Sequence, residues 1–327
     1  MKRLFAEWEQ QSSLLLVLPH KNSDWLPYLD EILFAYREFI KTASLYQHCV
    51  ILCANKTDAE KLLANIDNIT LIELPTNDTW IRDFGAIDIE DKDEIISYDF
   101  TFNAWGGKFE SVLDNMVNQK LYNNGYMKSR LVNVPFVLEG GSIDSNGEGI
   151  LLTTSKCLLE ENRNPNLNKY EIDIKLKELF GLKRIIWLEH GFLRGDDTDS
   201  HVDTLARFIT KDTIAYTVCE DKEDEHFDEL KKMQMQLKST GFNLLPLPLP
   251  NAVFYEGKRL PATYANFVFV NGAVLVPAYS GNTENNSKVQ KLLKSVLPNH
   301  EIVGVDASVF IRQYGSLHCA SINRFSL

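Results

Sequence analysis

Residues 267–276 read Phe267-Val268-Phe269-Val270-Asn271-Gly272-Ala273-Val274-Leu275-Val276, two apolar runs separated by Asn-Gly. Asn-Gly favours the two-residue turn of a tight β-hairpin, because both positions of that turn need a positive φ. The stretch therefore predicts a pair of antiparallel strands at 267–270 and 274–276. A doubly wound nucleotide-binding fold, in which single strands alternate with helices, is disfavoured by such a hairpin.

Outward from this hairpin, short apolar strands and amphipathic helices follow one another along the chain. Strands are expected at 14–18, 50–53, 70–74, 95–100, 185–188 and 213–218. Helices are expected at 29–43, 110–122, 169–180, 223–239 and 285–296, and Thr57 with Glu60 has the spacing of a capping box. The helices are too few to alternate with single strands, so the pattern predicts repeated units of strands plus one helix around a shared centre. No linker divides residues 1–327, which we expect to form one domain.

The composition is that of a globular protein with an excess of acidic residues. The chain has 327 residues, of which 44% are hydrophobic, and its formal net charge is −11. Without a cluster of Lys and Arg to neutralise phosphates, nucleic acid is not an expected partner. An acidic field would attract a small cation, although charge of this kind commonly serves solubility alone.

Neither the N-terminus nor the cysteines suggest export. Residues 1–9 carry acidic side chains where a signal peptide needs an apolar stretch, and no run reaches the roughly eighteen apolar residues of a membrane span. The five cysteines, at positions 49, 53, 157, 219 and 319, form no paired framework. We expect a cytoplasmic protein without a membrane partner.

One cysteine stands apart from the others, in the run Tyr314-Gly315-Ser316-Leu317-His318-Cys319-Ala320 near the end of the chain. The small residues around Cys319 indicate a turn that exposes a thiol. A buried, inert cysteine and a frayed tail are the alternatives. Phe310, Ile311 and Tyr314 are apolar enough to anchor the segment, so Cys319 is a candidate nucleophile.

A second cluster reads Asp196-Asp197-Thr198-Asp199-Ser200-His201-Val202-Asp203. Its alternating acids suggest a calcium loop, but Val202 stands where that loop needs glycine and Phe208 where it needs glutamate, which excludes the site. His201 and Asp203 would share one face of a strand or extended loop, an arrangement suited to metal ligation or to a shared substrate. A hydrogen-bonded structural histidine is the alternative for His201.

Three further segments hold polar or aromatic residues near expected strand ends: Trp80-Ile81-Arg82-Asp83-Phe84-Gly85, Asn103-Ala104-Trp105-Gly106-Gly107 and Glu139-Gly140-Gly141. Asp83 is expected in a loop of the kind that carries binding sites, with an ion pair to Arg82 as the alternative. The glycines after Glu139 would let another backbone or a ligand come close. Trp105 could wall a pocket, and simple packing is its alternative.

Taken in order, these segments resemble the agmatine deiminase and bacterial peptidylarginine deiminase family of the guanidine-modifying superfamily. The resemblance runs through Glu7-Trp8-Glu9, Trp80-x-Arg82-Asp83-x-Gly85, Phe102 to Gly107, Glu139-Gly140-Gly141, His201-x-Asp203 and Leu317-His318-Cys319. It implies an α/β fold of the pentein type. A pentein is a five-bladed propeller with pseudo-five-fold symmetry, whose blades meet at one central site.

The same resemblance implies roles for individual residues. Cys319 would be the nucleophile, His201 the general acid and base, and two carboxylates would hold a guanidinium: those of Asp83 and Asp203. The expected substrate contacts are Asp197, Glu139, Trp80 and Trp105. No metal and no organic cofactor is expected.

A guanidinium substrate would explain why these residue types occur together. It is planar, rich in N–H donors and permanently protonated, so two carboxylates in its plane can bind it. Its carbon is a poor electrophile, and a thiolate is the strongest nucleophile that a protein offers near neutral pH. Attack by Cys319 would release ammonia and leave a thiouronium, which water would convert to a urea.

Acidic residues around the far end of the substrate would favour agmatine, with N-carbamoylputrescine as the product. The alternatives are free arginine or peptidylarginine as the substrate, and a non-catalytic protein that binds polyamines. A metal-dependent hydrolase is also open, built on His201, Asp203, Asp197 and Glu139. A homodimer is compatible with the sequence, which does not fix the oligomeric state.

Overall fold

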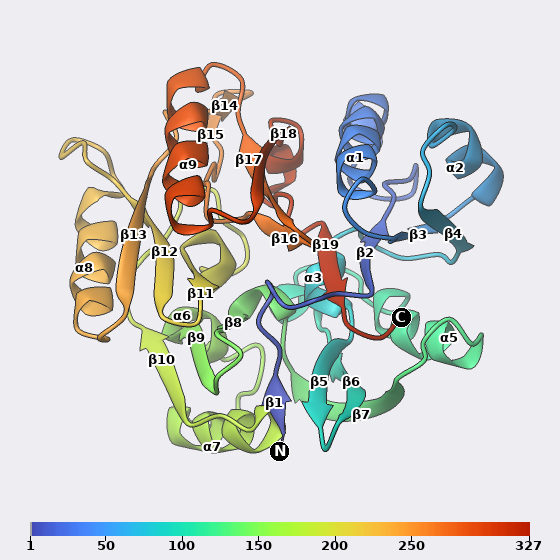
Figure 1. Cartoon of the computed structure of the whole chain (residues 1–327), viewed down its shortest axis with the longest axis horizontal. Helices are drawn as coiled ribbons and strands as arrows, with labels where there is room; N and C mark the ends of the chain where they lie inside the picture. The colour runs from blue at the N-terminus through green and yellow to red at the C-terminus, as the bar shows by residue number, and fades with distance from the viewer. Residues whose placement is uncertain (1) are drawn as a thin grey trace.

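The computed structural model describes residues 2–327, and its main feature is a ring of five small sheets (Figure 1). Four of the sheets repeat one motif, in which a first strand pairs antiparallel with a second and a third pairs parallel with the second. In chain order these strands are β5 (Ile87–Asp91), β6 (Glu94–Thr101), β7 (Arg130–Val137); β8 (Ile143–Ser145), β9 (Ile150–Thr154), β10 (Arg184–Leu188); β11 (Ala206–Thr210), β12 (Thr213–Val218), β13 (Asn243–Pro248); β16 (Val268–Val270), β17 (Ala273–Ala278) and β18 (Glu301–Asp306).

The fifth sheet is completed by the end of the chain. Strands β2 (Ser13–Val17), β3 (Cys49–Cys53) and β4 (Ile69–Glu73) are parallel, and the last strand, β19 (Ser321–Arg324), pairs antiparallel with β2. The first strand, β1 (Arg3–Leu4), pairs with β5 of the neighbouring sheet. The two ends therefore close the ring, and the segment just before β19 is docked into the core.

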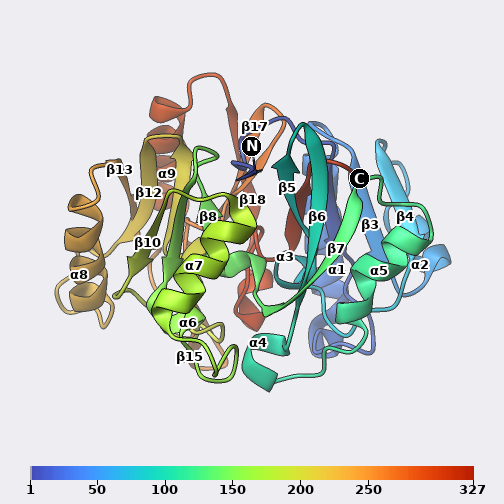
Figure 2. The same cartoon turned by 90° about the horizontal axis from the view of Figure 1, so that it is seen from below.

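The connection between the last two strands of each repeat holds one helix of seven or more residues, and these longer helices lie on the outside of the ring (Figures 1 and 2). They are α5 (Val117–Asn123), α7 (Lys169–Phe180), α8 (Phe227–Lys238) and α9 (Thr283–Val296), with α1 (Leu29–Ala43) between β2 and β3. In α1 the buried positions recur at helical spacing, for example Ile32, Tyr36 and Phe39, so one apolar stripe faces the sheets. Shorter elements are α2 (Lys56–Leu62), α3 (Ile81–Phe84), α4 (Ala104–Gly107), α6 (Ser155–Leu158), β14 (Phe254–Tyr255) and β15 (Lys258–Arg259).

The predicted five-bladed α/β architecture is confirmed, and so is the hairpin that indicated it. Val270 pairs with Ala273, which leaves Asn271 and Gly272 as the turn. Gly272 has a φ of +84°, but Asn271 has no positive φ, so the turn is not the expected type in which both positions are positive. The repeat is not visible when the segments of this sequence are compared with one another. The blades share the order and direction of their strands, whereas their side chains differ.

Two local predictions are wrong. Helix α2 is capped by the side chain of Asn55, which accepts a hydrogen bond from Asp58 N, so Thr57 lies inside the helix and is no cap. The helix predicted from residue 110 starts at Val117, after a 3₁₀ turn over Asp114–Met116. The true capping box lies at α7, between Asn168 and Glu171.

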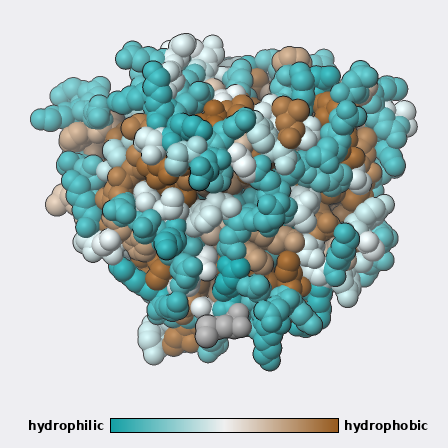
Figure 3. Space-filling model, viewed as in Figure 1, coloured by the Kyte–Doolittle hydropathy of each residue, from teal (hydrophilic) through white to brown (hydrophobic). Residues whose placement is uncertain are grey.

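Within residues 2–327 the helices are all too short or too polar to span a lipid bilayer. The face of the molecule seen in Figure 3 is mostly hydrophilic, with apolar side chains in small separate groups.

Candidate active site

Loops from several blades line a cleft of about 480 Å³. Of the predicted site residues, those that line it are Trp80, Asp83, Trp105, Asp197 and Cys319. Glu139, His201 and Asp203 are fully buried and are absent from the lining. Glu139 lies just before β8, and His201 and Asp203 lie just before β11.

The thiol of Cys319 is buried and has defined partners. Its Sγ accepts a hydrogen bond from Asn266 Nδ2 at 3.2 Å and donates to Asp203 Oδ2 at 3.6 Å. The oxygen of Asn266 accepts from the backbone N–H groups of His318 and Cys319, at 3.1 and 3.3 Å, which fixes this turn. Burial, and then the charges of Asp203 and Asp83, raise the pKa of Cys319 well above its usual value, so the free protein holds a protonated thiol.

Asp83 lies in α3 and is held by two neutral donors. Its Oδ1 accepts from Gly141 N and its Oδ2 from Trp105 Nε1, both at 2.9 Å. A Cβ at Gly140 would clash with the backbone oxygen of Arg82, so the predicted close approach of another backbone is confirmed at that glycine. A Cβ at Gly141 would lie 2.7 Å from His201 Nδ1 and 2.9 Å from Asp83 Oδ1. Burial, followed by the charge of Asp203, raises the pKa of Asp83.

Asp203 belongs to a charged network that extends away from the cleft. Its Oδ2 lies 2.7 Å from His318 Nδ1, and His318 Nε2 lies 2.9 Å from Glu7 Oε2, so each ring nitrogen faces a carboxylate. Glu7 also pairs with Arg207. Burial alone would raise the pKa of Asp203, but the hydrogen bond and charge of His318 outweigh it and lower that pKa. The second oxygen of Asp203 has no partner among residues 2–327.

His201 is the unsatisfied member of the site. Both of its ring nitrogens are buried without a hydrogen-bond partner in the described chain, and Nδ1 lies 3.7 Å from Asp83 Oδ1. Burial lowers the pKa of His201 to about 3, so the ring is neutral at physiological pH. It is free to accept a proton and to return it.

The extended conformation predicted around His201 is wrong. Val202–Thr204 forms a 3₁₀ turn, and the preceding loop is folded by side-chain hydrogen bonds. Asp196 Oδ2 accepts from Ser200 N at 2.7 Å, and Thr198 Oγ1 accepts from His201 N at 3.1 Å. These local bonds compete with strand formation and produce the turn.

Glu139 lies beside His201 and away from the lining of the cleft. Arg163 Nε donates to both of its carboxylate oxygens, at 2.8 and 3.0 Å, and Arg163 Nη1 donates to Asp199 Oδ2 at 2.8 Å. Burial raises the pKa of Glu139. This geometry gives no support to the predicted contact of Glu139 with the substrate.

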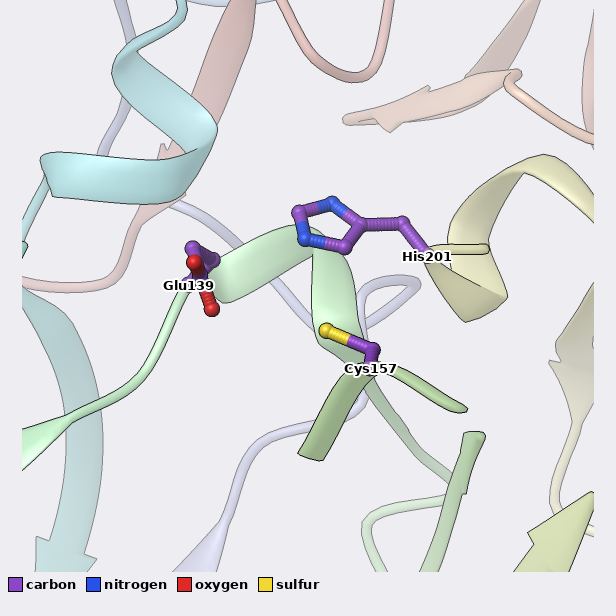
Figure 4. A group of neighbouring side chains, drawn as sticks. All are labelled: Glu139, Cys157 and His201. Atoms are coloured by element: carbon purple, nitrogen blue, oxygen red, sulfur yellow. The ribbon is translucent and has the colours of Figure 1, made fainter. Parts of the chain in front are cut away.

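One cluster in residues 2–327 has the ligand types and spacing of a metal site, and it consists of Glu139, Cys157 and His201 (Figure 4). One potential ligand atom of each lies within 4.8 Å of the others. The set proposed for a metal-dependent hydrolase, which included Asp197 and Asp203, is not brought together in this way.

The walls of the cleft include groups that the sequence did not single out. Asp24 and Asp78 line it together with Asp197, which pairs with Lys108 at 3.2 Å. Trp80 lies against Gly315, where an added Cβ would clash with the indole ring. Asp78 lies two residues before the segment Trp80 to Gly85, and this proximity is the feature of the sequence that points to it.

The chain matches the model of the Porphyromonas-type peptidyl-arginine deiminase family over residues 3–324. A Legionella pneumophila protein that carries the provisional name agmatine deiminase is 32% identical over 324 residues, with 96% of this chain and 92% of that protein covered.

Solved structures give the same relationship. A cysteine-to-serine variant of C. jejuni agmatine deiminase with substrate bound is 56% identical and superposes with a TM-score of 0.97, covering 99% of this chain and 96% of that one. A provisionally named arginine deiminase of Porphyromonas gingivalis is 37% identical, with a TM-score of 0.94 and coverage of 99% and 98%. By its sequence, its fold and the matched family model, this chain belongs to the Porphyromonas-type peptidyl-arginine deiminase family.

Proposed function

We propose that this protein is an agmatine deiminase, a hydrolase that converts agmatine and water to N-carbamoylputrescine and ammonia. The observation that carries the proposal is one constellation: the thiol of Cys319 in an acidic cleft, with Asp83 and Asp203 beside it and a neutral, unpartnered His201. The substrate-bound C. jejuni agmatine deiminase, at 56% identity, supports the same activity.

The guanidinium would bind between the carboxylates of Asp83 and Asp203. Burial and the nearby negative charge of Asp203 raise the pKa of Asp83, and the positive charge of a bound guanidinium would offset both effects by stabilising the ionised carboxylate. Asp203 Oδ1, which is buried and unpartnered in the described chain, is available to accept an N–H of the substrate.

Substrate binding would also activate the nucleophile. The pKa of Cys319 is raised by burial and by Asp203 and Asp83, so neutralising those carboxylates would lower it. The thiol proton would pass to His201, whose unpaired nitrogens can accept it. The thiolate would then attack the guanidinium carbon to give a tetrahedral adduct.

His201 would return this proton to one amino group, which leaves as ammonia, and a thiouronium would remain on Cys319. Neutral His201 would next deprotonate a water molecule as its oxygen bonds to the carbon. Collapse of this second adduct would break the C–S bond, the hydroxyl proton would restore the thiol, and His201 would give its proton to solvent. The product is a urea.

The charge of the cleft favours an amine at the far end of the substrate. Asp24, Asp78 and Asp197 line it. Arg312 is the cationic residue of the lining, and its Nη2 pairs with Glu31 at 2.9 Å while its guanidinium stacks on Tyr255. An ammonium would find acidic partners there, whereas the carboxylate of arginine would be repelled.

Free arginine or peptidylarginine remains the second candidate, because Arg312 could bind a carboxylate if its pair with Glu31 opened. We expect kcat/KM for agmatine to exceed that for arginine by at least about a hundredfold, on the order of 3 kcal/mol for a misplaced charge. A preference for arginine or for an arginine peptide would overturn the choice of agmatine and leave the chemistry in place.

The decisive experiment looks for ammonia release and for the covalent intermediate. Acid quenching during turnover of agmatine should trap an adduct on Cys319 with the mass of agmatine less ammonia, located by peptide mass spectrometry. Cys319→Ser should abolish turnover and adduct together. Full activity of that variant would contradict the thiol mechanism.

We infer that turnover needs no metal and no organic cofactor, so a chelator should leave the rate unchanged; loss of activity would favour a metal-dependent hydrolase. We further propose that residues 1–327 form one domain that works in the cytoplasm without nucleic-acid or membrane partners. A homodimer is compatible with this function, and light scattering would test it.

A further inference from the structure

We propose that Glu139, Cys157 and His201 form an inhibitory binding site for Zn²⁺, separate from the thiol of Cys319. The three side chains come from three different segments and are turned toward one another in Figure 4. One ligand atom of each lies within 4.8 Å of the others, and all three residues are buried. A thiol, an imidazole and a carboxylate are the ligand types that zinc sites use.

The imidazole has no competing partner. Both nitrogens of His201 are buried and lack a hydrogen bond within residues 2–327, so a ligand can be gained there without breaking a contact. Because Nδ1 lies on the side of Asp83, the second nitrogen is the one that faces Glu139 and Cys157 (Figure 4).

The thiol of Cys157 is not used in the proposed reaction. It is fully buried, and burial raises its pKa well above the usual value, so it is protonated in the free protein. Zinc would displace this proton to solvent as the Zn–S bond forms.

Arg163 holds the third ligand in place. It donates to both oxygens of Glu139, and each carboxylate oxygen keeps a second lone pair for a metal. Hydrogen bonds of this kind orient the ligands of many metal sites. The positive charge of Arg163 is shared with Asp199, which lies 2.8 Å from its Nη1.

The site would have to contract slightly around the ion. Bonds of about 2.0–2.3 Å in a tetrahedral zinc site put the ligand atoms about 3.5 Å apart, so these atoms would converge by roughly 1 Å, with water as the fourth ligand. A metal-bound imidazole can no longer carry protons. Inhibition therefore follows from zinc binding, and this consequence rests on the proposed role of His201.

Direct binding is tested in Cys319→Ser protein, where the nucleophile cannot contribute a thiolate. Titration with Co²⁺ should give an intense near-ultraviolet thiolate-to-cobalt band, which Zn²⁺ displaces. The band should vanish when Cys157→Ala is added, and persist when Cys219→Ala, which removes a half-buried thiol, is added instead. A band that survives Cys157→Ala, or no band in Cys319→Ser protein, overturns the proposal without bearing on the deiminase reaction.

Inhibition is tested in proteins that keep Cys319. Zn²⁺ should inhibit agmatine turnover by the unmodified protein and by Cys219→Ala at the same free concentration. Cys157→Ala should turn over agmatine and need more than about tenfold more Zn²⁺, since the loss of even an outer-shell partner weakens a metal site that much. Equal inhibition of the unmodified protein and Cys157→Ala would place the zinc on another thiol and overturn the proposal. If neither protein turns over agmatine, the proposed function fails, and the cobalt titration still decides on the site.

Discussion

Two buried histidines lie close to Asp203, and their surroundings are opposite. His318 is fully engaged: Nδ1 lies 2.7 Å from Asp203 and Nε2 lies 2.9 Å from Glu7. His201 is just as buried, yet neither of its nitrogens has a partner within residues 2–327. One ring is part of a closed network, and the other is surrounded by groups that it does not bond.

The difference distinguishes a residue that positions the site from a residue that takes part in the reaction. A buried polar group without a partner costs roughly 1–3 kcal/mol, whereas a satisfied network fixes its members in one geometry. His318 therefore suits the task of positioning Asp203 and the Cys319 turn. His201 keeps both nitrogens free at the expense of stability, as a proton carrier must.

The largest effect is expected for the free ring. His201→Asn should lower kcat by about a thousandfold or more, because the group that carries protons to and from Cys319 is lost. The free energy of unfolding should stay equal or rise slightly, since no hydrogen bond is removed. Steady-state kinetics and urea unfolding measure the two quantities.

The matched control is His190→Asn, which removes a half-exposed histidine paired with Glu229 on the surface. It should leave kcat unchanged. If His201→Asn retained kcat within a few fold, the contrast between the two rings would have no functional meaning.

For the engaged ring we expect a loss of stability as well as of activity. His318→Gln would leave the carboxylates of Glu7 and Asp203 buried without their partner, which costs about 3 kcal/mol in comparable buried pairs. Urea unfolding should show this loss, while His48→Gln, at a part-buried surface position, should not. An unchanged free energy of unfolding in His318→Gln would refute the proposed role of His318 in positioning Asp203 and the Cys319 turn.

The contrast also shows how far sequence reasoning reaches. Periodicity and the Asn271-Gly272 turn are local signals, and they predicted the strands, the helices and the repeated α/β unit. The resemblance then supplied Cys319, His201, Asp83 and Asp203. The network around His318 has no local signal, because Glu7 is 311 residues away and meets it only when the ring closes.

The same limit applies to Glu139, Asn266 and Asp78. Glu139 is bound by Arg163, which comes from a loop 24 residues later, and no local signal predicted this pair. Asn266 holds the Cys319 turn across 53 residues. Contacts between blades depend on how sheets pack, so a linear pattern predicts which residues matter more readily than what each one touches.

The third prediction concerns the pH dependence of stability that the buried, neutral ring of His201 causes. The folded state holds the pKa of His201 at about 3, below the ordinary value of about 6.5 in an unfolded chain, through burial. Between these values the unfolded state binds the extra proton, so stability falls as the pH drops from 6.5 toward 3. At pH 5 this amounts to about 2 kcal/mol.

Thermal unfolding between pH 7 and pH 5 would show the effect. Native protein should lose several degrees more than His201→Asn over this range, because the variant lacks the group that titrates. Parallel curves for the two proteins would mean that His201 is protonated, or solvated, in the folded state.

The smallest effect is expected outside both histidine regions, at Asp78 in the lining of the cleft. Burial, together with the charge of Asp24, raises the pKa of Asp78 to about 6, so Asp78 becomes ionised as the pH rises from 5 to 7. KM for agmatine should fall over this range, because an ionised Asp78 attracts the ammonium of the substrate. Asp78→Asn should raise KM by roughly tenfold at pH 7 and remove the pH step, with kcat unchanged.

The control is Asp58→Asn, on the exposed surface of α2, which should keep both the KM and its pH dependence. His201, with a pKa of about 3, does not titrate in this window. A step near pH 6 that persists in Asp78→Asn would therefore have to come from another acid of the cleft, and Asp78 would then not be the partner of the ammonium.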